Sequence, residues 1–238
     1  MGQSWVDQEY NCLFTALEGV VYPDFETCLI DDPAAGRAGV RYVGGIDWGF
    51  NNPFAAVWGW LDRDDVLWVG WERYQSRCPL REHIAAVRAR HDEDPTCPDP
   101  ARVMWYADPS GPEEIVECRA AGWKVLKGFN DIRPGIAAVT ARLRSGRLRV
   151  ARRRCPNLVA EAQLYRYPAP HERALAGENP VDEHNHALGA LRYLIARLDH
   201  TFIVRLRKPA NSDPADTDPP DKAPRRDDRD NEDLWTTI

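Results

Sequence analysis

The sequence Gly44-Gly45-Ile46-Asp47-Trp48-Gly49-Phe50-Asn51-Asn52-Pro53 places one aspartate between an apolar run and a turn rich in glycine, asparagine and proline. Residues 40–43 lead into it, and an apolar-aromatic run from Phe54 to Leu61 follows it. This pattern predicts a strand, a tight hairpin and a second strand. Asp47 ends the first strand. Because a carboxylate in apolar surroundings is costly to bury unless it holds a cation or a strong donor, Asp47 is the first candidate metal ligand.

A third apolar run follows the hairpin after a short polar turn. The runs cover residues 40–46, 54–61 and 66–73, and Asp62-Arg63-Asp64-Asp65 separates the last two. Successive apolar runs joined by polar turns predict an antiparallel three-strand meander.

Beyond the meander, helical and extended patterns alternate. We expect helices over residues 79–90, 113–118, 132–145, 157–165 and 187–198, and strands over residues 103–107, 123–126 and 148–150. This order predicts an α/β fold with a mixed central sheet flanked by helices. The strand at 103–107 is almost wholly apolar, as in strands buried on both faces, and Asp108 follows it. Asp47 and Asp108 thus leave the carboxyl ends of two strands, where open α/β sheets place their sites.

Composition limits the classes of protein that the chain can represent. Its 238 residues are 43% hydrophobic and include nine tryptophans, which is enough for one domain with a real core. The net charge of −6 gives no overall basic surface, so any contact with nucleic acid must be local. Six scattered cysteines without a CxxC pair favour free thiols over zinc or disulfide frameworks. We expect a soluble intracellular protein, since no apolar run is long enough for a membrane and no signal peptide opens the chain.

Three regions are predicted along the chain. Residues 40–205 carry the regular strand and helix patterns and form the expected domain. Residues 1–39 do not pattern as a self-sufficient unit, and we interpret them as an N-terminal arm or linker. Residues 206–238 are rich in Pro, Asp, Arg, Lys and Asn with almost nothing to bury, which predicts a disordered charged tail.

One region of this acidic chain is clearly basic. Arginines facing phosphates are typical of DNA-binding surfaces, although a solvated helix face would have the same composition. No base-reading motif is present, so weak sequence preference is expected. The candidate DNA-binding residues are Arg142, Arg144, Arg147, Arg149, Arg152, Arg153 and Arg154, extended by Lys124 and Lys127.

Three blocks together resemble the nuclease domain of the large terminase subunit of tailed bacteriophages, which belongs to the RNase H-like superfamily. The blocks are Gly45–Gly49, Trp105–Pro109 and Asn185–Tyr193, and residues 129–132 and Glu161 with residues 165–167 are also similar. The likeness covers roughly residues 40–200. Residues 1–39 resemble the family's bridge from its ATPase motor, and no block resembles the Gly-rich phosphate loop of that motor. The resemblance implies an RNase H-like fold.

The resemblance also implies a function. The implied function is to act as a DNA endonuclease, of phage or prophage origin, that cuts concatemeric phage DNA for genome packaging in the bacterial cytoplasm. The implied partners are double-stranded DNA, an ATPase motor domain, the small terminase subunit and the portal. The family's acidic residues hold two Mg²⁺ or Mn²⁺ ions for phosphodiester hydrolysis. Asp47 corresponds to its first acid and Asp108 to its second.

The third acid of the family is missing at its expected position. The family's aspartate usually stands three residues after a histidine, and here Gly189 follows His186 at that distance. We rank His186 first, Glu183 second and Asp182 third as replacement ligands, although Asp182 also resembles a helix N-cap. Without a replacement, the resemblance implies a weakened or inactive nuclease.

Other classes of protein fit parts of the sequence. A resolvase or transposase-type nuclease of the same superfamily would share the acids and would prefer branched DNA. A non-catalytic DNA-binding or packaging module would account for Gly189. An actin-like ATPase lobe has a first phosphate loop of the form Gly-Ile-Asp-x-Gly, but it needs a second phosphate loop that this sequence lacks. Nicking of supercoiled plasmid with Mn²⁺ distinguishes a nuclease from a non-catalytic module, nucleotide-dependent stabilisation would favour the ATPase lobe, and a preference for branched junctions would favour a resolvase.

Overall fold

The computed structural model describes residues 19–31, 41–169 and 179–200. The predicted tail, residues 206–238, lies outside these ranges, as do residues 1–18 and 32–39 of the predicted arm. The strands are β1 (Leu29–Ile30), β2 (Arg41–Asp47), β3 (Phe54–Leu61), β4 (Leu67–Gln75), β5 (Met104–Ala107), β6 (Lys124–Lys127) and β7 (Leu148–Ala151). The helices are α2 (Leu80–Glu93), α3 (Pro112–Ala120), α4 (Ile132–Arg144), α5 (Pro156–Leu164) and α7 (His186–Leu198), with short 3-10 turns η1 (Phe25–Cys28) and η2 (Pro100–Arg102).

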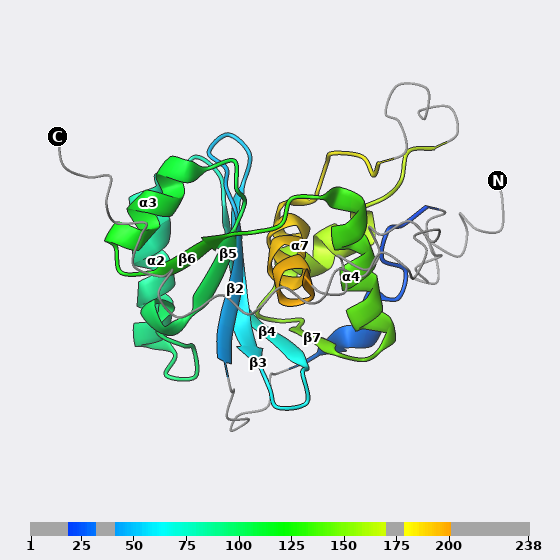
Figure 1. The fold of residues 1–238 in the computed structure, drawn as a ribbon, viewed down its shortest axis with the longest axis horizontal. Coiled ribbons are helices and arrows are strands. Elements are labelled where there is room, and N and C mark those ends of the chain that lie inside the picture. Colours follow the sequence, from blue (N-terminus) through cyan, green and yellow to red (C-terminus); the bar gives the residue numbers. More distant parts are fainter. Residues whose placement is uncertain (1–18, 32–40, 170–178, 201–238) are drawn as a thin grey trace, which may run out of the picture.

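The strands form one seven-stranded sheet in the order β1-β7-β4-β3-β2-β5-β6, with helices on both faces (Figure 1). β3 is antiparallel to β2 and β4, which confirms the predicted meander. All other neighbouring strands are parallel. The carboxyl ends of β2 and β5 therefore lie at the same edge of the sheet, as the sequence predicts.

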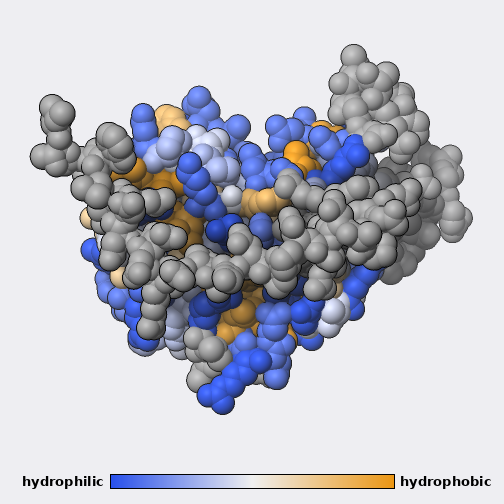
Figure 2. Space-filling model, viewed as in Figure 1, coloured by the Kyte–Doolittle hydropathy of each residue, from blue (hydrophilic) through white to orange (hydrophobic). Residues whose placement is uncertain are grey.

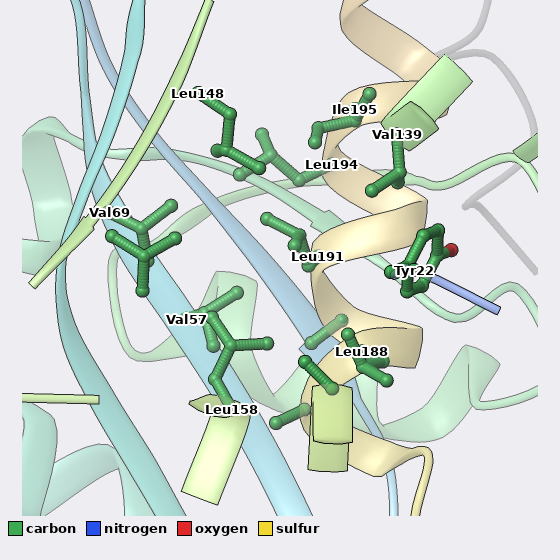
Figure 3. Close-up of a cluster of buried hydrophobic side chains, with 14 of the residues drawn as sticks. Tyr22, Val57, Val69, Val139, Leu148, Leu158, Leu188, Leu191, Leu194 and Ile195 are labelled. Atoms are coloured by element: carbon green, nitrogen blue, oxygen red, sulfur yellow. The ribbon is translucent and has the colours of Figure 1, made fainter. Parts of the chain in front are cut away.

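α7 anchors one face of the sheet. Its apolar residues Leu188, Leu191, Leu194 and Ile195 are at most 2% exposed, and Figure 3 shows this helix packed beside the strands that carry Val57, Val69 and Leu148. Full burial of one such side chain contributes about 1.5–3 kcal/mol, so this helix contributes a large share of the core. A Cβ atom on Gly45 would collide with the Ala190 carbonyl. The missing side chain therefore lets α7 lie directly on β2.

The opposite face is packed with tryptophan under α2 and α3. Six of the nine tryptophans are buried in this cluster, and the rings of Trp105 and Trp123 stack with their centroids 4.8 Å apart. Large aromatic side chains bury much apolar area each, so they hold the second helical layer firmly against the sheet. The six are Trp58, Trp60, Trp68, Trp71, Trp105 and Trp123.

Residues 19–31, which the sequence analysis assigns to the N-terminal arm, pack against the domain and add a strand to its sheet. Tyr22 and Phe25 are 3% and 4% exposed and pack in the α7-side core. The Val21 N–H donates to the Tyr165 carbonyl over 2.9 Å, and β1 pairs with β7. The apolar residues here sit in a short turn and a two-residue strand. Their spacing therefore has no period that a sequence pattern could reveal.

Two simpler expectations concern thiols and membranes. Five cysteines are free, as predicted for them, and the structure also buries all five: Cys28, Cys78, Cys97, Cys118 and Cys155. Cys12 lies outside the described residues. Among the helices described, none combines the length and apolar character that crossing a membrane requires.

Candidate active site

Asp47 is the last residue of β2, and its side chain faces α7. It is 13% exposed, and its Oδ2 lies 3.0 Å from Nδ1 of His186. Burial raises the pKa of Asp47, the hydrogen bond to His186 opposes this rise, and the charge of Asp108 adds to it. A buried acid with a nearby acid is the arrangement that a bound cation stabilises.

Asp108 follows β5 at the neighbouring strand end. Ile46 of β2 is in register with Ala107 of β5, and the Asp108 N–H donates to the Ile46 carbonyl over 2.9 Å. The Asp108 carboxylate accepts hydrogen bonds from the N–H and the hydroxyl of Ser110, at 3.0 and 2.7 Å. The structure thus brings the two predicted acids to adjacent positions of one edge.

The start of α7 is fixed by a carboxylate from another helix. Asn185 precedes α7 but gives it no side-chain cap. Instead Glu161 of α5 accepts from the backbone N–H groups of His186 and Leu188, at 3.1 and 3.0 Å. The Tyr74 hydroxyl donates to the same carboxylate over 2.8 Å, and Glu161 is only 4% exposed. Since these bonds satisfy helix N–H groups, they hold His186 in place beside Asp47.

The candidates for the missing third acid are placed differently. A Cβ on Gly189 would lie 3.3 Å from Cγ of Asp47, so the position where the sequence resemblance implies an acid faces that carboxylate directly. His186 contacts Asp47. Asp182 is exposed and lines the same cavity, where it accepts a hydrogen bond from Asn185. Glu183 is exposed and is not among the residues that line this cavity.

The site opens into a cavity of about 190 Å³. In Figure 2 the upper outline of the molecule is notched between the lobe with α3 and the lobe with α4. Among the described residues lining the cavity, Arg192 is the sole lysine or arginine. We did not predict a role for Arg192, although it lies one turn beyond Gly189 on α7, a spacing that places two residues on one helix face. The lining residues are Tyr22, Asp47, Trp48, Tyr165, Asp182, Asn185, His186, Leu188, Gly189, Arg192 and Tyr193.

The donor types at this edge fit a hard divalent cation. Asp47 and Asp108 offer carboxylate oxygens, which Mg²⁺ and Mn²⁺ prefer, and His186 offers an imidazole nitrogen. The space in front of Asp47 is open because Gly189 has no side chain. In the described part of the chain, however, no three His, Cys, Asp or Glu side chains come close enough together to form a metal-binding group.

Arg142 must be removed from the predicted DNA-binding set. It is 1% exposed, and its guanidinium donates to both Asp199 oxygens at 2.7 Å and to the Asp65 carboxylate. It is therefore a buried structural residue. Its partners come from distant parts of the chain, so a run of arginines in the sequence could not reveal them.

The other predicted basic residues are distributed over several surfaces. Arg144, Arg147 and Arg152 are within ion-pair distance of acidic side chains, and Arg149 donates to the carbonyls of Gly146 and Leu148. Arg153 and Arg154 line a separate cavity together with Arg73 and Arg90. Lys127 is paired with Ala107, next to Asp108, whereas Lys124 lies at the opposite end of β6.

Comparison with known proteins is informative at the level of structure. No family model and no curated protein matches the sequence. The large terminase of a thermophilic bacteriophage aligns with a TM-score of 0.64 and 22% identity, over 78% of this chain and 47% of that one. The nuclease domain of the P22 large terminase gives 0.57 and 20%, over 77% and 94%. The Mn-bound nuclease domain of the large terminase from bacteriophage SPP1 gives 0.55 and 19%, over 71% and 94%.

The mixed seven-stranded sheet with helices on both faces gives the described part of the chain an RNase H-like α/β fold. Within this class, the chain has the fold of the nuclease domain of a phage large terminase, as the sequence resemblance implies. It spans about half the length of the first of these three proteins, the large terminase of the thermophilic phage, which has also been solved in complex with ATP-gamma-S.

Proposed function

We propose that this domain is a metal-dependent DNA endonuclease that cuts concatemeric phage DNA during genome packaging. One observation carries the proposal: Asp47 and Asp108 leave adjacent strand ends on a terminase-nuclease fold, with His186 held against Asp47. Two neighbouring acids at the carboxyl edge of a sheet are suited to phosphodiester hydrolysis with divalent cations.

We infer that Asp47 and Asp108 hold two Mg²⁺ or Mn²⁺ ions. The nuclease domain of SPP1 was solved with bound Mn, and that of phage G20c with bound magnesium. Bound cations supply an activated water and neutralise developing negative charge. His186 contacts Asp47 and is our first candidate for the third ligand, ahead of Asp182, whereas Glu183 is less favoured because it lies away from the cavity.

The substrate we propose is double-stranded DNA, bound mainly through its phosphates. Lys127 lies at the same sheet edge as Asp108, and exposed arginines such as Arg153 offer further phosphate contacts. An ATPase motor, a small terminase subunit and a portal complete the proposed packaging machine, which works in the bacterial cytoplasm.

Plasmid cleavage tests the proposal. Supercoiled plasmid incubated with Mn²⁺ should be nicked and then linearised by the wild-type protein. Asp47→Ala and Asp108→Ala should abolish cleavage, whereas Asp64→Ala, in the exposed β3–β4 turn, should leave it unchanged. Equal cleavage by all of these proteins would identify a contaminant and overturn the assignment.

A second candidate function is that of a DNA-binding packaging module without catalysis. Gly189 favours it, because the acid expected beside Asp47 is absent. Wild-type protein that binds DNA but leaves plasmid intact across Mn²⁺ and Mg²⁺ concentrations would support this alternative. A marked preference for cutting branched junctions would instead favour a resolvase-type nuclease.

A further inference from the structure

Arg192 is built into the wall of the cavity that contains Asp47. It lies on α7, three residues after Gly189 and six after His186, and all three positions line the cavity. Its side chain is half-buried and lines the cavity.

Contacts on several sides hold the Arg192 side chain in place. Nη1 donates to the Asn130 carbonyl over 3.2 Å, and the guanidinium carbon lies 4.8 Å from the centroid of the Tyr193 ring. A Cβ on Gly135 would lie 2.6 Å from Cγ of Arg192. A glycine inside a helix costs about 1 kcal/mol relative to alanine. Gly135 of α4 is thus an unfavourable helix residue that leaves room for this arginine.

Among the described residues, no carboxylate holds the Arg192 guanidinium at ion-pair distance. Within the described ranges, Arg192 makes no ion pair, although Asp47 and Asp182 line the same cavity. Arginine carries five N–H donors, and the Asn130 carbonyl takes one from Nη1. By contrast, Arg142 donates to the carboxylates of Asp199 and Asp65. A positioned guanidinium that has more donors than its neighbours accept, beside an acidic site, is suited to a phosphate group.

We propose that Arg192 binds the phosphate that is cut. The inference rests on the proposed nuclease function and deepens it, because it assigns the cavity side chain that contacts the reacting group. In the hydrolysis, a water oxygen bonds to phosphorus, one ester P–O bond breaks, and a proton passes to the leaving oxygen. Arg192 donates hydrogen bonds to a non-bridging phosphate oxygen as negative charge builds up there. It transfers no proton, since a guanidinium stays protonated in proteins.

The test compares plasmid cleavage kinetics in Mn²⁺ for the wild type, Arg192→Ala, Arg192→Met and Arg197→Ala. Arg197 is the matched control because it is an exposed arginine of the same helix outside the cavity. Loss of one transition-state donor lowers kcat on the order of 100-fold. The KM for plasmid should change by less than about threefold, because many other phosphate contacts bind duplex DNA. Arg192→Met keeps the stem against Gly135, and melting temperatures show whether each variant is folded.

Ethylguanidinium, which resembles the head group of arginine, tests whether the Arg192 guanidinium acts on the phosphate or only supports the structure. Added to Arg192→Ala, it should restore part of kcat, and the same concentration of sodium chloride should not. An active wild type with an equally active, folded Arg192→Ala would overturn this inference and leave the proposed function standing. The inference would also be overturned if Arg197→Ala lowered kcat as much as Arg192→Ala does. An inactive wild type would overturn the proposed function itself.

Discussion

A Cβ atom on Gly189 would lie 3.3 Å from Oδ1 of Asp47, so a helix position without a side chain faces the central carboxylate of the site. The sequence resemblance to terminase nucleases implies an acid at this position. The geometry shows that an acid placed there would point at Asp47 from the next turn after His186. We therefore predict that a single substitution at Gly189 changes cation binding at the site.

Gly189→Asp should make stability dependent on the cation. Without metal, two carboxylates at this distance repel each other, which lowers the melting temperature. With Mn²⁺ the new carboxylate becomes a ligand, and we expect a larger Mn²⁺-induced rise in melting temperature than in the wild type. Cleavage should reach half its maximum at a lower Mn²⁺ concentration.

Gly189→Asn is the matched control, since asparagine has nearly the same shape without the charge. It should show any steric cost of the new side chain and none of the additional Mn²⁺ stabilisation. Identical Mn²⁺ responses in the Asp and Asn variants would show that position 189 does not face a cation site.

Glu161→Ala should destabilise the domain and loosen the start of α7. The substitution leaves the N–H groups of His186 and Leu188 and the Tyr74 hydroxyl without their acceptor in a buried place. We expect a loss of about 2–4 kcal/mol in the free energy of unfolding, measured by urea denaturation. Tyr74→Phe removes one of these bonds and should cost about 1 kcal/mol. If Tyr74→Phe cost as much as Glu161→Ala, the cap on α7 would not be the source of the effect.

The sequence was sufficient to locate the elements that carry Asp47 and Asp108. β3 begins and ends where the apolar run does, at Phe54 and Leu61, because the flanking turn residues mark both ends. The proximity of Asp47 and Asp108 could be predicted because each acid stands at the carboxyl end of an apolar run that predicts a strand. These features depend on local patterns, which a sequence displays directly.

The remaining features depend on contacts between distant residues. Arg142 is paired with Asp199, 57 residues away, and with Asp65, 77 residues away. Glu161 caps α7 from 25 residues upstream. Neither side chain differs in local pattern from an exposed helical residue, so a sequence cannot show that they are buried. β1 has two residues, too few for any alternation to appear.

Arg142→Met should reduce stability without weakening DNA binding. Removing one partner of a buried ion pair typically costs about 3–5 kcal/mol, because the carboxylate of Asp199 keeps its charge in a largely buried place. Arg144→Met is the control, since its side chain is 74% exposed, and its stability should change by less than about 0.5 kcal/mol. Urea denaturation and a DNA-binding titration measure the two properties separately. If a folded Arg142→Met variant bound DNA more weakly than the wild type, the prediction would be wrong and Arg142 would have a role in DNA binding.

His83 should make the domain less stable as the pH falls. Burial, together with the nearby Arg73 charge, lowers the pKa of His83 to about 4, from an ordinary value of 6.5. Between these two pH values the unfolded chain binds the proton and the folded protein does not, so stability decreases as the pH falls. The slope is at most about 1.4 kcal/mol per pH unit, or about 3 kcal/mol across the window.

The measurement compares urea unfolding of the wild type and His83→Gln from pH 7.5 to pH 4. Glutamine keeps an acceptor for Arg73, whose Nε donates to Nδ1 of His83 over 3.2 Å, but it does not titrate. Glutamine cannot reproduce the stacking of His83 on Phe54, with ring centroids 4.0 Å apart, so the variant should be less stable at pH 7.5. The difference between the two proteins should then shrink as the pH falls from 6.5 to 4, because the wild type alone loses the His83 contribution. A difference that stayed constant across this range would show that His83 titrates alike in the folded and unfolded chains.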